Sequence, residues 1–143
     1  MKPQVLISCV KVLSLSLVVA ALPSMVMATP APKDAKVYII SPSDGDTVSS
    51  PVKVVFGLSG MGVAPAGVSK KNTGHHHLLI DAEKLPDMGK PMAKNVKHFG
   101  GGQTETMLDL KPGTHTLQLI LGDKAHVPFK PALVSDKITI TVQ

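Results

Sequence analysis

The sequence contains no arginine and no tryptophan, and its 143 residues include only one cysteine, one tyrosine and three phenylalanines. The cysteine, Cys9, lies near the start of the chain, in a segment that we expect to be removed. The remaining chain then has no disulfide and no thiolate that could act as a nucleophile or a metal ligand. Its stability must come from the burial of Val, Ile and Leu side chains.

The absence of arginine also argues against a nucleic-acid partner, because its planar guanidinium is the usual group that grips phosphate and guanine. Two of the 15 lysines, Lys2 and Lys11, lie in the N-terminal segment, which leaves 13 lysines against 10 acidic residues and a net charge of about +3. Only Lys70 and Lys71 are adjacent. The scattered lysines indicate a solvated surface with no nucleic acid bound to it.

The N-terminal region has the pattern of a secretory signal peptide. Lys2 and Lys11 supply positive charge, residues 12–22 are almost all apolar, and residues 26–28 have the small or branched side chains that signal peptidase reads. We expect residues 1–28 to be removed, which leaves a periplasmic or secreted protein with no membrane span. The alternative is an uncleaved anchor, but the apolar run is about half of the roughly 20 residues that a spanning helix needs.

Beyond the signal peptide, the sequence predicts a short lead-in and one β domain. Residues 29–36 are rich in Pro and Ala and are expected to be flexible or extended, whereas residues 37–143 are long enough for a single domain. No segment shows a convincing 3.6-residue period. Apolar–polar alternation and β-branched runs between Gly/Pro turns predict strands at residues 37–40, 52–58, 75–81, 103–110, 116–121 and 137–142.

This succession of short strands predicts an all-β fold, an immunoglobulin-like antiparallel β-sandwich of about six or seven strands with two long loops. The turn at residues 41–48 and the Pro-Gly turn at residues 112–117 are similar to those of bacterial immunoglobulin-like modules. A small open barrel is the alternative. The two loops, residues 60–74 and 85–102, border the histidine-rich segments, and loops of this length are often functional.

All six histidines follow the signal peptide, and three of them are consecutive at the start of a predicted strand. Because neighbouring residues of a strand point to opposite faces, His75 and His77 share one face, while His76 faces the core with Leu78 and Ile80. Residues two apart on a strand lie about 6–7 Å apart at Cα, a spacing at which two imidazoles can converge on one ion.

Two further histidines can complete such a site. His98 ends the second long loop, and His126 lies in the loop of residues 122–131. The sequence therefore predicts a metal site made of His75, His77, His98 and His126. Imidazole suits zinc, copper, nickel and iron, so the ligands alone do not identify the metal, and copper or zinc is expected.

The remaining candidates are expected to be structural. His115 lies near a turn and should be packed or hydrogen-bonded, and the methionines should fill gaps, although thioether ligands would favour Cu(I). Asp81 is the best placed of three strand-end carboxylates, with Asp109 and Asp123, to orient a histidine as a hydrogen-bond acceptor. The glycines of residues 99–102 are expected to let the backbone approach His98 or a ligand.

No sequence motif indicates an enzyme. The glycine-rich segment lacks the Lys-Ser/Thr that ends a phosphate-binding loop, and no helix is predicted after it. The Gly-x-Ser-x-Gly turn of serine hydrolases does not occur in the sequence. We therefore expect a protein without catalytic residues.

Three motifs resemble one known family. They are the segments at residues 72–81, 98–105 and 121–128, which read NTGHHHLLID, HFGGGQTE and LGDKAHVP. Together they are similar to the bacterial exported family known as domain of unknown function 4399 over about residues 37–142. The resemblance implies an exported single domain and no particular activity. Family members often read His-x-Pro-His in the last motif, and Phe129 stands at its fourth position here.

The leading hypothesis is a periplasmic protein that handles or senses a metal ion through the histidine cluster. The rival is a cell-envelope interaction module that binds a polysaccharide, peptidoglycan or another envelope protein, with histidines that order its long loops. The small number of aromatic rings speaks against a sugar-stacking surface. A third hypothesis is a pH-responsive domain, because histidines change charge between about pH 5 and 8.

Overall fold

The computed structural model describes residues 28–92 and 96–143, and this part of the chain is all-β with no helix. None of the described residues forms a helix long and apolar enough to cross a membrane. The predicted signal peptide lies almost wholly outside the described residues. The strands are β1 (Lys36–Ser41), β2 (Thr47–Val48), β3 (Val52–Ser59), β4 (Gly62–Val63), β5 (Thr73–Ile80), β6 (Lys97–His98), β7 (Glu105–Leu108), β8 (Gly113–Gly122) and β9 (Ile138–Val142).

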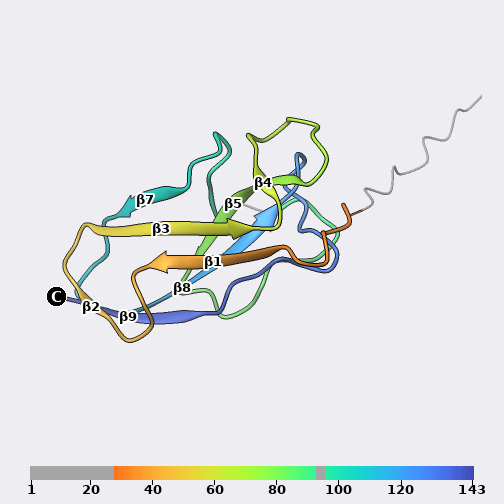
Figure 1. Cartoon of the computed structure of the whole chain (residues 1–143). Coiled ribbons are helices and arrows are strands. Elements are labelled where there is room, and N and C mark those ends of the chain that lie inside the picture. The colour runs from red at the N-terminus through yellow and green to blue at the C-terminus, as the bar shows by residue number, and fades with distance from the viewer. Residues whose placement is uncertain (1–27, 93–95) are drawn as a thin grey trace, which may run out of the picture.

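The strands form two sheets. The smaller sheet has the order β1-β3-β7 and is antiparallel, whereas the larger has the order β2-β9-β8-β5-β4, with β6 paired to β5. Most pairs of the larger sheet are antiparallel, but β2 with β9 and β4 with β5 are parallel. Figure 1 shows β1 and β3 side by side in front of β5 and β8. The all-β prediction is confirmed, and the larger sheet is mixed rather than purely antiparallel.

One hydrophobic core joins the two sheets. In β9 the residues Ile138, Ile140 and Val142 are buried and alternate with exposed threonines, as the period of two predicts. In β3 the side chains of Val54 and Phe56 face the same core. The core also contains Ala35, Val37, Val52, Leu78, Phe99, Leu108, Leu117, Leu119, Leu121, Phe129 and Leu133.

The central strands of the larger sheet are buried on both faces. In β8 the residues from Leu119 to Gly122 include no exposed side chain, and Gly74 to Leu79 of β5 are all buried. Leu79 and Ile120 face away from the main core and pack with Val96 in a second, smaller cluster. When both faces of a strand are covered, its side chains no longer alternate between buried and exposed. The outer face of this sheet is therefore also covered by other parts of the chain, and it holds the candidate site.

Two predicted loops contain short strands. The loop predicted at residues 60–74 includes β4 and the first residues of β5, and the loop predicted at residues 85–102 includes β6. Both short strands pair with β5, and the local sequence pattern could not reveal this pairing. In the lead-in, Thr29 and Ala31 run beside Lys130, with backbone hydrogen bonds of 2.9 and 3.1 Å.

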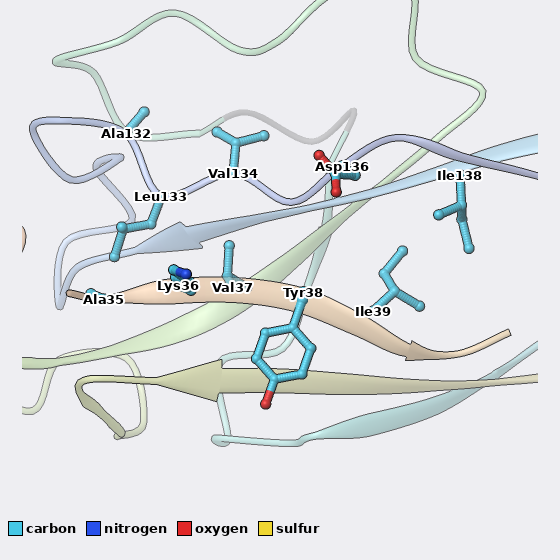
Figure 2. Close-up of a pocket in the computed structure, with 10 residues that line it drawn as sticks. All are labelled: Ala35, Lys36, Val37, Tyr38, Ile39, Ala132, Leu133, Val134, Asp136 and Ile138. Carbon is cyan, nitrogen blue, oxygen red and sulfur yellow. The ribbon is translucent and has the colours of Figure 1, made fainter. Parts of the chain in front are cut away.

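A groove of about 450 Å³ lies between β1 and residues 132–138. Figure 2 shows Leu133, Val134 and Ile138 on one side of it and Val37 on the other. No histidine lines this groove. It marks the opening between the two sheets and does not belong to the histidine site.

Candidate metal centre

Strand β5 directs its three consecutive histidines to two sides of the larger sheet. His76 is fully buried on the core side, and its ring centroid lies 5.2 Å from that of Phe56. His75 and His77 share the opposite face, with ring centroids 4.7 Å apart. They are 0% and 2% exposed, because chain segments that follow β5 and β8 cover this face. The alternation of these side chains predicted from the sequence is confirmed.

Strand β6 places His98 beside the first two histidines. His98 lies opposite His77 in the antiparallel register of β5 and β6, so its prediction as a loop residue was wrong. Its ring centroid lies 5.0 Å from that of His75 and 5.1 Å from that of His77. A Cβ on Gly100 would overlap the His98 ring. The expected close approach of this glycine-rich segment to His98 is therefore confirmed.

A tight turn after β8 presents His126 to the other three histidines. Its φ of 64° lies in the left-handed region, which costs a non-glycine residue about 1–2 kcal/mol. The buried carboxylate of Asp123 holds the turn: its Oδ1 accepts hydrogen bonds from the N–H groups of Ala125 and Val127 at 2.9 and 3.0 Å. The Thr29 hydroxyl donates to its Oδ2 at 2.6 Å. Backbone strain that is held by such bonds often occurs at functional sites.

The four histidines offer four ring nitrogens that all lie within 4.8 Å of one another. The ring centroid of His126 is 4.5 Å from that of His98, and its Nδ1 is 3.1 Å from Nε2 of His75. In a tetrahedral site with Zn–N distances of about 2.0–2.1 Å, ligand nitrogens are about 3.3 Å apart. The pair of His75 and His126 is close to this spacing, and all four nitrogens lie near enough to one another to hold a single ion.

Several buried ring nitrogens lack a hydrogen-bond partner among the described residues. They are Nδ1 of His75, Nδ1 of His77 and both nitrogens of His76. The backbone of Gln103 and of Gly57 lies near enough to His76 to raise its pKa, against the larger lowering effect of burial. Buried polar atoms are usually paired, so each exception needs an explanation. An ion bound through Nδ1 of His77 would give that nitrogen a partner, whereas His75 faces His126 through Nε2 and not through its unpaired Nδ1.

Burial keeps the inner histidines neutral. Burial, followed by the charges of His126 and His98, lowers the pKa of His75 to about 4. Burial and then the charges of His75, His98 and His126 lower the pKa of His77 to about 3. Burial also lowers the pKa of His98, with His126 as the second cause. Metal binding requires neutral imidazole, so these lowered pKa values favour metal binding at neutral pH.

His115 lies outside the cluster, as the sequence predicted. Its Nδ1 is 2.7 Å from Oδ2 of Asp81, and its Nε2 is 2.9 Å from the carbonyl oxygen of Lys111. The hydrogen bond with Asp81 raises the pKa of His115. Asp81 also accepts a hydrogen bond from the Thr116 N–H at 2.8 Å. Asp81 therefore orients a histidine, as expected, but this histidine is His115, which lies outside the cluster.

Asp123, and not Asp81, supports the backbone of a turn that carries one of the clustered histidines. It belongs to the same turn as His126 and accepts hydrogen bonds that fix that turn. The signal in the sequence is the Gly-Asp-x-x-His spacing from Gly122 to His126, in which an Asp bonds to backbone N–H groups two and four residues later. Asp81 had been preferred as the supporting carboxylate because it is close to His75 and His77 along the predicted strand.

The chain has Phe129 where family members often have a histidine, and the position of Phe129 explains why this difference leaves the cluster of four histidines complete. Phe129 is 3% exposed and belongs to the main core. A Cβ on Gly74 would lie 2.8 Å from its Cε2, so the ring packs closely against the start of β5. A residue at this position faces the core rather than the four clustered histidines.

Comparison with known proteins identifies a family without adding an activity. No curated protein and no solved structure matches the chain with significant similarity. The model of one family, described as "Domain of unknown function (DUF4399)", matches residues 54–143. This match covers more than half of the chain and includes all six histidines. The chain therefore belongs to the DUF4399 family, as its three motifs had indicated.

Proposed function

We propose that this is an exported, periplasmic protein with an immunoglobulin-like β-sandwich that binds one transition-metal ion, zinc or copper. The ligands are His75, His77, His98 and His126. The observation that carries the proposal is the convergence of their four ring nitrogens within 4.8 Å, from three separate parts of the chain.

The chemistry of the donor set supports a transition metal over a hard cation. All four donors are imidazole nitrogens, whereas Ca²⁺ and Mg²⁺ require oxygen ligands. Four protein ligands fill a tetrahedral shell, which is typical of sites that hold a metal; catalytic zinc sites usually leave one position open for water. The proposed role is therefore metal handling or sensing without catalysis.

The test measures metal binding by untagged mature protein, because a His-tag would itself bind metal. The protein is isolated without chelators for elemental analysis, then stripped and titrated with Zn²⁺ or copper. His98→Ala/His126→Ala is the informative variant, since His98 is exposed and His126 half-buried. Removing the fully buried pair on β5 would leave cavities and confuse loss of binding with loss of folding.

His115→Ala is the matched control, because it removes a histidine that lies outside the cluster. The proposal expects about one equivalent of metal bound to the wild type and to the control, and none to the double variant at micromolar metal. A wild-type protein that takes up neither zinc nor copper at that concentration would overturn the proposal.

One observation favours a second function. Nε2 of His75 and Nδ1 of His126 are 3.1 Å apart, which also suits a hydrogen bond between the two imidazole rings. In that case the histidines order the loops, and the loops bind an envelope protein or a polysaccharide. This alternative expects no metal uptake, together with a lower melting temperature in His126→Ala than in His115→Ala.

A further inference from the structure

Met92 lies against two of the four clustered histidines. Its backbone N–H donates a hydrogen bond to the carbonyl oxygen of His126 at 2.9 Å. Its side chain is half-buried and packs against the small cluster of Leu79, Val96 and Ile120 on the same face of the sheet. The segment that carries Met92 is thus tied to the turn that carries His126.

The methyl end of Met92 and the ring of His77 both lie close to Gly122. A Cβ on Gly122 would lie 2.8 Å from Cε of Met92, 2.6 Å from Cε1 of His77 and 3.1 Å from Nδ1 of His77. Both groups therefore border the space that a side chain on Gly122 would fill. The thioether sulfur is one bond from that methyl, and Nδ1 of the nearby His77 ring is buried without a hydrogen-bond partner among the described residues.

The other described methionines do not share this position. Met61 packs against the main core on the far side of the sheet, and Met88 and Met107 are 47% and 53% exposed. Met107 belongs to β7, in the smaller sheet. A gap-filling role explains Met61, but Met92 places a soft, polarisable atom at the edge of a set of nitrogen donors.

We propose that Met92 is a thioether ligand that replaces one of the four histidines in the tetrahedral shell when this centre holds Cu(I); the inference rests on the metal-binding function proposed above. Thioether and imidazole donors together suit copper, and soft thioether favours the Cu(I) state, whereas Zn²⁺ in proteins is bound by imidazole, thiolate and carboxylate. The histidines alone accept either metal, so Met92 supplies the preference between them.

The test compares two metals and two methionine variants. Cu(I) affinity is measured without oxygen by competition with bicinchoninate, and Zn²⁺ affinity by competition with a chromophoric chelator. Met92→Leu keeps the volume and removes the sulfur, and Met107→Leu makes the same change far from the histidines. We expect Met92→Leu to weaken Cu(I) binding at least about tenfold and to leave Zn²⁺ binding within about twofold of wild type. Met107→Leu should change neither affinity.

X-ray absorption of the wild-type Cu(I) protein gives an independent result, because it detects a sulfur neighbour without any substitution. A Cu(I) spectrum with nitrogen neighbours only, or equal losses of Cu(I) and Zn²⁺ affinity in Met92→Leu, overturns the role of Met92 and leaves the histidine site standing. A wild-type protein that binds neither metal overturns the function on which the inference rests.

Discussion

Acidification should destabilise the metal-free protein through its buried histidines. His75 and His77 are 0% and 2% exposed, with pKa values lowered to about 4 and about 3 from the ordinary 6.5. Below pH 6.5 the unfolded chain therefore binds more protons than the folded one, and stability falls as the pH decreases. The loss begins near pH 6.5 and continues until the pH reaches the folded-state pKa values.

The size of the effect follows from the pKa difference. At pH 5 the medium is about 1.5 units below the unfolded pKa and still above both folded values, and each unit corresponds to about 1.36 kcal/mol. Each imidazole then lowers the free energy of unfolding by about 2 kcal/mol, and the two together by about 4 kcal/mol. Domains of this size have a total stability of about 5–15 kcal/mol, so the melting temperature should fall on the order of 10 °C.

The assay is thermal or urea unfolding of chelator-treated protein at half-unit steps from pH 7.5 to pH 5. The pair of Asp81 and His115 opposes the trend, because the raised pKa of His115 gives stability that is present at low pH and lost as the pH rises. All measurements therefore use the His115→Gln background. His75→Gln/His77→Gln in that background removes the two groups that carry the calculated effect, while His76 and His98, whose pKa values are also lowered, remain.

A melting temperature that stays constant between pH 7 and pH 5 would refute the conclusion that these imidazoles are buried and neutral. So would an equal decrease in the variant that lacks both of them. Saturating Zn²⁺ should flatten the upper part of the curve, because a ligand that binds only the folded state adds stability until protons displace it.

Three further predictions concern the turn, the core and export. Asp123→Ala removes the acceptors of the hydrogen bonds that hold the His126 turn, and it should weaken metal affinity about 10–100-fold. The control Asp109→Ala changes an exposed carboxylate and should leave metal affinity unchanged. Equal affinities of the two variants in a chelator titration would contradict this role of Asp123. Ile140→Ala empties a fully buried position in β9 and should cost about 2–5 kcal/mol in urea unfolding. The exposed neighbour Thr141→Ala should change stability by about 0.5 kcal/mol or less, and similar losses in both would contradict the placement of the core. Protein recovered from the periplasm should begin at Thr29 by N-terminal sequencing and mass spectrometry, and a chain that keeps residues 1–28 would contradict signal cleavage.

Alternation along single strands was predictable because it depends only on the backbone. The period of two placed Ile138, Ile140 and Val142 on one buried face, and it separated His75 and His77 from His76. These facts follow from the geometry of an extended chain, in which successive side chains point to opposite sides. The same local reasoning gave the all-β class.

Pairing between distant segments was not predictable from local pattern. The residues of β6 have no strand signal of their own, and they become a strand because they add to the edge of β5, which places His98 opposite His77. The identity of the histidine that Asp81 contacts was not predictable for the same reason. Asp81 is close to the histidines along the chain, but the register of β5 and β8 places it beside Thr116 and His115.

The sequence by itself determined that the domain is built from strands, that the chain contains a single cysteine, and that histidines are its candidate metal ligands. The tertiary structure alone decided that four of the six histidines converge, that both faces of β5 are buried, and that Asp123 and Met92 lie beside the cluster. The physical reason is that composition and periodicity act over a few residues, whereas a metal centre depends on contacts between segments that are brought together only when the sheet forms.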